Sequence, residues 1–287
     1  MTNSLEVKNL SKSFDDFALR DISFTLPQGY LMGLIGPNGS GKTTLIKLIL
    51  NMLKREEGEI SVLGLDNITH EQQAKAELGV VFDSNYFNDD WQVAQVEKSL
   101  SPFYPNWNSE QFAGMLNRFH ISPTKKVKEL SKGMQMKLML ACAFSYNAKL
   151  LILDEPTSGL DPVSRDELLH ILSEYIEDGQ HSVLFSTHIT ADLERIADYI
   201  TYINYGELFF SGNKDEFVDM FRVVKGAREE LSTDIQEKAV SVRTFSTGFE
   251  ALIKTQDCVL FPNLTVEPAS IDEIVVFVSK KGGSGDA

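Results

Sequence analysis

A run of glycines that ends in a lysine and a threonine is the clearest chemical signal in the sequence. It fits the phosphate-binding pattern G-x-x-x-x-G-K-[ST] and reads Gly36, Pro37, Asn38, Gly39, Ser40, Gly41, Lys42, Thr43. In such a loop, backbone N–H groups and the start of the next helix point at phosphate oxygens, because the helix dipole favours negative charge there. Lys42 would contact the β- and γ-phosphates, and the Thr43 hydroxyl would ligate Mg²⁺. The run therefore predicts a nucleoside triphosphate site.

Two adjacent carboxylates follow the apolar run 150–153. A buried strand would hold Asp154 at its carboxyl end, where this residue could accept a Mg²⁺-bound water. Glu155 would then be free to orient or polarise the water that attacks the γ-phosphate. A strand that simply ends in solvated acids is the alternative, and the phosphate loop in the same chain favours the hydrolytic interpretation.

His188 follows another apolar run and is the third candidate for this chemistry. A lone histidine is more often structural or solvated than catalytic. Its place after a buried strand, however, would put it on the ligand edge, where it could contact the γ-phosphate or the attacking water.

Short apolar runs predict the elements that must position these groups. The expected strands cover residues 5–10, 19–26, 31–35, 78–82, 149–153 and 182–185, and the expected helices cover 44–53 and 162–176. The first two strands alternate and should pair antiparallel, whereas the later strands alternate with helices, which is typical of a parallel α/β sheet. Right-handed crossovers place the carboxyl ends of such strands on one edge. Met52 is expected on the apolar face of the first helix.

The chain divides into a large and a small part. We expect one domain over residues 1–221, which includes a mostly helical, aromatic-rich stretch from 83 to about 121 and a helical subdomain at about 84–145. A small accessory domain is expected over 222–287. Within the small domain, residues 239–243 should form a strand, and 270–277 either a helix or a strand. Residues 282–285 are expected to be a loose tail.

Composition limits the class of protein. The formal charge of −14 argues against nucleic acid as a partner, because phosphate contact needs a basic face. Cys142 lies in an apolar run and is expected to be a core residue, and Cys258 has no metal ligand at a suitable spacing. No signal peptide and no membrane-spanning run is expected. If the protein works at a membrane, it should do so from the cytoplasmic face with the help of a partner's helices.

Taken together, these motifs resemble the ATP-binding subunits of ATP-binding cassette (ABC) transporters. Residues 130–135 are similar to the signature loop of that family, residues 158–161 to its D-loop, and His188 to its switch histidine. Phe14 lies where the family places an aromatic ring that stacks on adenine. The resemblance covers about residues 1–221. It implies a P-loop NTPase fold of the ABC type, with a parallel core sheet, an antiparallel β subdomain, a helical subdomain and, here, a small C-terminal α/β domain.

The resemblance also implies the roles of individual residues. ATP and Mg²⁺ would be the cofactors, and Glu155 and His188 the catalytic residues. Metal contacts would come from Thr43, Asp154 and Asp83, the last of which stands where the family usually has glutamine. Nucleotide contacts would come from the phosphate loop together with Phe14, Thr44, Ser131, Gly133 and Asp161. Lys132 and Met134 depart from the commonest signature sequence.

In this family two subunits face head to tail, so that Ser131 and Gly133 would contact the γ-phosphate held by the partner subunit's Lys42. The implied partners are a second ATP-binding subunit, identical or related, and a membrane-spanning permease on a separate chain. The aromatic residues after Asp83 are the candidate groove for that permease. The signature sequence, residues 104–107 and the small C-terminal domain resemble a subgroup of bacterial exporters of antibiotics, antimicrobial peptides or similar amphipathic compounds. The alternatives are a soluble mechanical ATPase that acts on DNA or ribosomes and, less favoured, a P-loop kinase or GTPase.

Overall fold

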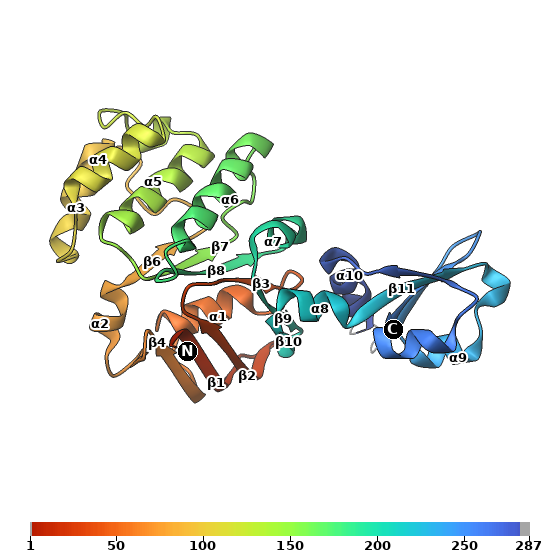
Figure 1. Cartoon of the computed structure of the whole chain (residues 1–287). Coiled ribbons are helices and arrows are strands. Elements are labelled where there is room, and N and C mark those ends of the chain that lie inside the picture. The colour runs from red at the N-terminus through yellow and green to blue at the C-terminus, as the bar shows by residue number, and fades with distance from the viewer. Residues whose placement is uncertain (1, 282–287) are drawn as a thin grey trace.

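The computed structural model describes residues 2–281, and these form a large mixed sheet with helices on its faces and a smaller sheet at one end (Figure 1). The strands are β1 Asn3–Ser13, β2 Ala18–Pro27, β3 Leu31–Ile35, β4 Glu57–Val62, β5 Leu65–Asp66, β6 Leu78–Val81, β7 Leu150–Asp154, β8 Ser182–Thr187, β9 Tyr199–Asn204, β10 Glu207–Asn213, β11 Phe221–Gly226, β12 Ala239–Thr244, β13 Phe249–Lys254 and β14 Thr265–Pro268. The α-helices are α1 Lys42–Ile49, α2 Glu71–Ala76, α3 Val93–Leu100, α4 Ser109–Arg118, α5 Lys132–Ser145, α6 Pro162–Ile176, α7 Thr190–Ile196, α8 Lys214–Asp219, α9 Thr233–Lys238 and α10 Ile271–Lys281.

Within the described residues, the large sheet runs in the order β5-β4-β1-β2-β10-β9-β3-β8-β7-β6. Strands β1, β2, β4 and β5 pair antiparallel, whereas β9, β3, β8, β7 and β6 pair parallel. Both the antiparallel part and the parallel core were predicted from the sequence and are confirmed. Strand β9 was not predicted, although it lies beside β3 at the centre of the sheet.

The parallel core has a hydrophobic cluster on each face. Along β7, Leu150 and Ile152 belong to the cluster with α1, whereas Leu151 and Leu153 belong to the cluster with α5 and α6. This is the alternation expected of a strand that is covered on both sides. Cys142 lies buried in the second cluster, as predicted. The carboxyl end of β7 is thereby fixed between two packed layers.

The first helix is shorter than the sequence predicted. It begins at Lys42 and ends at Ile49, whereas residues 44–53 were expected. Asn51 adopts a left-handed conformation with φ of 52°, and the N–H groups of Asn51 and Met52 donate to the carbonyls of Leu48 and Lys47. This is the hydrogen-bond pattern of a Schellman motif, which ends a helix. The expectation that Met52 joins the apolar face was therefore wrong, and its side chain is exposed.

The segment between β6 and β7 is mostly helical, as expected. Helices α3, α4 and α5 form a group at one end of the sheet, seen at the upper left of Figure 1. Phe112 and Phe119 are buried in this group, while Phe103 is exposed. The ring of Tyr104 stacks on that of Tyr146 with centroids 3.8 Å apart. The aromatic side chains here are thus divided between core and surface.

The small sheet lies at the other end of the molecule, with the order β12-β13-β11-β14 (Figure 1). The sequence did not decide whether residues 270–277 form a helix or a strand. In the structure all of them except Ser270 lie in the helix α10. Ser270 and Glu273 exchange hydrogen bonds at its start, in the manner of a capping box. The region from β11 to the end of α10 is called the C-terminal unit below. The predicted tail at 282–285 lies outside the described residues.

We predict that Gly79→Ala destabilises the protein by overpacking the core where β6 meets β7 and α5. A Cβ atom at Gly79 of β6 would lie 2.9 Å from the Cβ of Ala143 and would also meet Leu151, and both neighbours are buried. The free energy of unfolding, measured by chemical denaturation, should fall by about 1–3 kcal/mol. Gly114→Ala in α4 is the matched control, because a Cβ there meets nothing within 4 Å. That variant should gain roughly 0.5–1 kcal/mol from helix propensity.

Candidate nucleotide-binding and hydrolysis site

The glycine-rich loop joins β3 to α1, as the sequence predicted, and opens on a cavity. Gly39 and Gly41 have φ angles of 80° and 108°, in the region that favours glycine. A Cβ at Gly41 would lie 2.6 Å from the Leu19 side chain and 2.7 Å from that of Phe17. The cavity measures about 550 Å³ and is lined by Asp16, Phe17, Asn38, Gly39, Ser40, Gly41, Lys42, Thr43, Thr44 and Glu155. The loop and one of the two predicted carboxylates therefore face the same space.

Lys42 is the buried cation of this site. Its ammonium donates hydrogen bonds to the carbonyl oxygens of Gly36 at 2.8 Å and Pro37 at 3.4 Å. Burial lowers the pKa of Lys42 below its ordinary value, and the negative charges of Glu155 and Asp154 oppose that shift. A buried ammonium gains strongly from any anion that comes within reach, because little water screens it. The residue is thus suited to hold phosphate oxygens.

Thr43 and Asp154 connect the first turn of α1 to the end of β7. The Thr43 hydroxyl donates a hydrogen bond of 2.9 Å to Oδ2 of Asp154. The other carboxylate oxygen, Oδ1, is buried and has no hydrogen-bond partner. A buried carboxylate oxygen without a donor is costly unless a cation or water satisfies it. The pair therefore fits a hard cation such as Mg²⁺, which binds through one or two protein oxygens together with water and phosphate.

Glu155 links the phosphate loop to the end of β8. Its backbone is left-handed, with φ of 52°, and its N–H donates to the Ser186 carbonyl at 2.9 Å. The carboxylate lies 3.8 Å from the Lys42 ammonium through Oε1 and 2.7 Å from Nδ1 of His188 through Oε2. The backbone N–H of His188 donates to the same Oε2 at 3.3 Å. Glu155 is thus held between a cation and an imidazole, with 19% of its side chain exposed.

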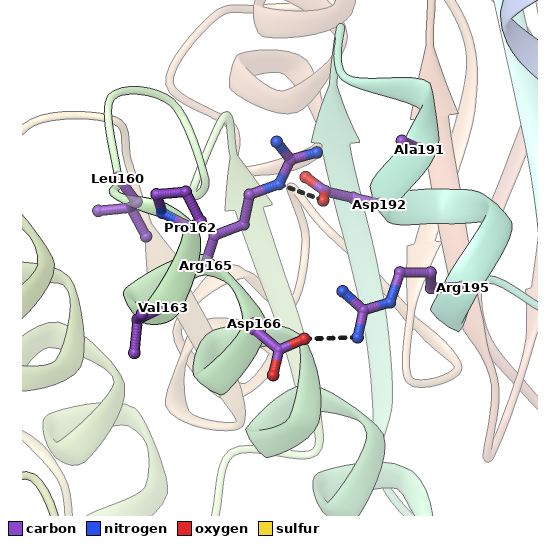
Figure 2. Close-up of a pocket in the computed structure, with 8 residues that line it drawn as sticks. All are labelled: Leu160, Pro162, Val163, Arg165, Asp166, Ala191, Asp192 and Arg195. Atoms are coloured by element: carbon purple, nitrogen blue, oxygen red, sulfur yellow. Dashed lines mark hydrogen bonds and ion pairs between the residues drawn. The ribbon is translucent and has the colours of Figure 1, made fainter.

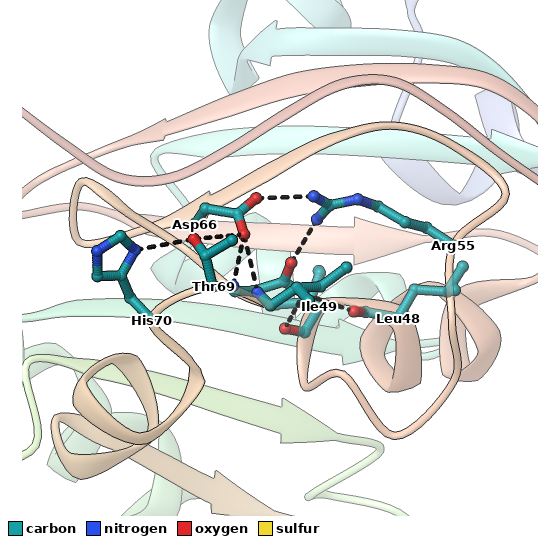
Figure 3. A network of polar contacts seen from close by, with 8 residues as sticks. Leu48, Ile49, Arg55, Asp66, Thr69 and His70 are labelled. Atoms are coloured by element: carbon teal, nitrogen blue, oxygen red, sulfur yellow. Dashed lines mark hydrogen bonds and ion pairs between the residues drawn. The ribbon is translucent and has the colours of Figure 1, made fainter.

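A polar network holds the far end of α1 (Figure 3). The Asn67 amide donates to the carbonyls of Leu48 and Ile49, which end that helix, at 2.9 Å each. Arg55 donates to Asn67 Oδ1 at 2.5 Å and to Asp66 at 2.7 Å. Hydrogen bonds from the Thr69 backbone and from Arg55 lower the pKa of the Asp66 carboxyl. These bonds fix the helix whose first turn carries Lys42 and Thr43.

The sequence and structure of the chain match those of known proteins. The sequence model of the family described as "ABC transporter" matches residues 19–158. The "ABC transporter ATP-binding protein YtrB" of Bacillus subtilis is 30% identical over 234 residues, which are 80% of this chain and 78% of that protein. The "Nod factor export ATP-binding protein I" of Rhizobium leguminosarum bv. viciae is 30% identical over 251 residues, 82% of this chain and 79% of that protein. The chain belongs to the ABC transporter ATP-binding proteins.

A solved structure, "Structure of ATP binding subunit of ABC transporter", agrees with this assignment. It superposes with a TM-score of 0.67 at 28% identity, and the match covers 74% of this chain and 90% of the other. The protein is therefore the ATP-binding and ATP-hydrolysing subunit of an ABC transporter. No helix among residues 2–281 is long and apolar enough to cross a membrane.

The remaining predicted site residues of this ABC subunit lie away from the cavity. Asp83 is exposed and lines a separate hollow of about 380 Å³ together with Lys132 and Gln135. Ser131 is exposed and caps the start of α5, and Asp161 caps the start of α6. Hydrogen bonds from Ser164 and Val163 lower the pKa of Asp161. Gly133 is buried in the first turn of α5, where a Cβ would lie 3.1 Å from the Ser164 hydroxyl.

The aromatic ring that lines the cavity is Phe17, which the sequence analysis did not select. Phe14, the residue predicted to stack on adenine, is 41% exposed and packs on Phe17 with ring centroids 6.3 Å apart. The two residues are three positions apart in the turn between β1 and β2, so a search for any aromatic side chain in that turn would have found both. Asp16 also lines the cavity. No pattern in the sequence indicated that an acidic side chain would lie beside the phosphate loop.

Proposed function

We propose that the triphosphate of ATP binds in this cavity and that Glu155 and His188 act in its hydrolysis. The observation that carries the proposal is the contact between the two halves of the site: Thr43 bonds to Asp154 at 2.9 Å, and Lys42 lies 3.8 Å from Glu155. Backbone N–H groups of the loop and the Lys42 ammonium would hold the phosphates. The residues assigned to the nucleotide are Gly36, Pro37, Asn38, Gly39, Ser40, Gly41, Lys42, Thr43 and Thr44.

Glu155 is the group best placed to act on the attacking water. Its Oε1 faces Lys42, which would hold the γ-phosphate, and its Oε2 accepts a hydrogen bond from His188. A carboxylate oriented in this way can accept a proton from water as the water attacks phosphorus. His188 would orient the carboxylate, and its exposed ring could contact the γ-phosphate.

Mg²⁺ would be held by Thr43 and Asp154. The unpartnered Oδ1 of Asp154 and the hydroxyl of Thr43 supply the oxygen ligands that such an ion prefers. When bound, the ion neutralises charge on the β- and γ-phosphate oxygens. The resemblance suggested Asp83 as a further metal contact. This role stays a prediction, because Asp83 lines a different hollow from the one that the phosphate loop lines.

The exposed starts of α5 and α6 support a head-to-tail dimer with an identical or related subunit. We propose that Ser131, Gly133 and Asp161 complete the nucleotide site of the partner, and that Phe14 stacks on adenine. Ser131 stands at the N-terminus of α5, which favours negative charge such as that of a phosphate, whereas the Asp161 carboxylate already caps the N-terminus of α6. Two-fold symmetry would then use each surface twice.

A hollow beside the helical group is the proposed docking surface for a membrane-spanning permease on a separate chain. It measures about 270 Å³ and is lined mostly by apolar and aromatic side chains from four segments of the chain, namely Leu50, Met52, Lys75, Leu78, Val80, Phe82, Tyr86, Tyr104 and Tyr146. Tyr86 is the exposed aromatic residue among those that line the hollow, and aromatic side chains around an apolar hollow are typical of protein interfaces. The protein would then work at the cytoplasmic face of the membrane.

We further propose that the transporter is an exporter of peptides, antibiotics or similar amphipathic compounds. The support is the export named for the rhizobial relative, together with the signature sequence at Ser131 and Gly133. In this proposal residues 1–221 are the ATPase domain, with its helical part at about 84–145, and residues 222–287 are an accessory domain.

We predict that Glu155→Gln leaves ATP binding intact and nearly abolishes hydrolysis, because the amide cannot accept the proton of the attacking water. Phosphate release should fall by about a hundredfold or more, while the affinity for ATP, measured by titration, should be unchanged. The variant should also accumulate as an ATP-bound dimer in size-exclusion chromatography. Normal phosphate release would show that another group activates the water.

We predict a different effect for Lys42→Ala, since the ammonium holds phosphate oxygens before the reaction begins. The affinity for ATP should fall by about tenfold or more, which corresponds to one charge-assisted hydrogen bond. Unchanged affinity in the same titration would contradict the assignment of the phosphate loop.

We predict that Tyr86→Glu reduces co-purification with the permease from membranes by about tenfold, because it places a charge at the rim of the apolar hollow. Phe103→Glu is the matched control: Phe103 is also an exposed aromatic residue of this segment but does not line the hollow. Loss of co-purification in the control alone would place the interface elsewhere. In reconstituted complexes, stimulation of hydrolysis by amphipathic peptides would support the proposed cargo class.

A further inference from the structure

Helix α7 directly follows the switch histidine of the proposed site. It begins at Thr190, after His188 and Ile189. The N–H of Ile189 donates to the hydroxyl of Thr187 at 2.9 Å, so the connection to β8 is tight. Any shift of α7 would therefore move His188 relative to Glu155, whose carboxylate it contacts at 2.7 Å. The packing of α7 therefore determines the position of His188 relative to the Glu155 carboxylate.

On the side of α6, the packing around α7 is incomplete. A hollow of about 600 Å³ lies between the start of α6 and α7 (Figure 2). Two ion pairs cross it, one between Arg165 and Asp192 and one between Arg195 and Asp166 at 2.6 Å. The second pair is more than half exposed on both sides and contributes little to stability. Of the two ion pairs between α6 and α7, the one between Arg165 and Asp192 is therefore the better buried.

On the opposite side, α7 is joined to α10 of the C-terminal unit. The hydroxyl of Thr190, which is 6% exposed, donates to Oδ1 of Asp272 at 3.1 Å. The backbone N–H of Ile271 donates to Oε1 of Glu194 at 3.0 Å. The Glu194 carboxylate therefore satisfies a free N–H group at the start of α10 and favours the dipole of that helix. These bonds connect both ends of α7 to the first turn of α10.

Helix α10 is in turn part of the C-terminal unit. Ile271, Ile274 and Phe277 are fully buried in the same cluster as Val223 of β11 and Leu252 of β13. The guanidinium of Arg243 in β12 lies over the Phe277 ring, 4.2 Å from its centroid. Because close-packed elements move together, a displacement of the small sheet would be passed to α10. Packing and hydrogen bonds therefore connect the small sheet to His188 through α10 and α7.

We propose that Thr190, Glu194 and Asp272 are positioning residues through which the C-terminal unit sets the contact between His188 and Glu155. In this way the unit controls the rate of hydrolysis without touching the nucleotide. The inference depends on the role proposed above for His188. A partner or modification that moves the C-terminal unit would change the turnover number and leave ATP affinity unaltered.

The test measures kcat, KM and thermal unfolding of Asp272→Ala, Asp272→Asn and a control. Asp272→Ala should lower kcat by about tenfold or more, because small misplacements of a catalytic group are costly, while KM for ATP stays unchanged. Asp272→Asn should restore most of the activity, since its amide oxygen can still accept from Thr190. Glu267→Ala is the control, because Glu267 of β14 pairs with Lys225 at 2.7 Å within the C-terminal unit. It should leave kcat unchanged.

A purely structural role would lower the unfolding temperature of Asp272→Ala with no selective change in kcat, and that result would overturn the inference. His188→Ala separates this inference from the proposed function. If His188→Ala lowers kcat and Asp272→Ala does not, the inference alone fails. If His188→Ala leaves kcat unchanged, the proposed role of His188 fails and the route through it fails as well. In the His188→Ala background, Asp272→Ala should have no further effect on kcat.

Discussion

The hydrogen bond from Thr43 to Asp154 joins the two segments on which the chemistry of the site depends. One segment is the first turn of α1, which carries the cation Lys42, and the other is the end of β7, which carries two carboxylates. Neither segment could form the site alone, because a phosphate needs the cation and the attacking water needs the base. The bond also leaves Asp154 Oδ1 buried without a partner. Such a group costs free energy in the isolated protein and is expected where a ligand will satisfy it.

Several features of the surrounding structure serve to hold those two segments in place. Asn67 satisfies the carbonyl groups at the far end of α1, and Arg55 orients Asn67. Ser186 of β8 accepts from the backbone of Glu155, which turns that side chain back toward Lys42. Because the Lys42 ammonium is buried, its charge is stabilised only while the Glu155 carboxylate stays close to it. Lys42 and Glu155 are thus mostly buried in this site, whereas 47% of the His188 side chain is exposed.

The phosphate loop, the strand before Asp154 and the helix α6 could be predicted from the sequence, because each is set by a local pattern of glycine, apolar and polar residues. The confirmed parallel sheet then accounts for the meeting of Lys42 and Glu155 at one edge. The ring of Phe17 at Gly41 could not be predicted in this way, because that contact depends on how two distant turns pack. The same holds for the bond between Thr190 and Asp272, which are 82 positions apart. Strand β9 was missed because buried threonine and tyrosine residues interrupt its apolar pattern.

Strand β7 supplies alternate side chains to two separate hydrophobic clusters, and this arrangement limits how the gene can change. Removing one residue from the strand would move leucine and isoleucine side chains to the opposite cluster, because successive side chains point to opposite faces. The carboxylate of Asp154, however, would then project from the opposite face of the sheet. Such a deletion would separate Asp154 from Thr43 and so remove the bond that joins the two halves of the site. Loops elsewhere can lengthen or shorten during evolution, whereas the length of this strand cannot vary by a single codon.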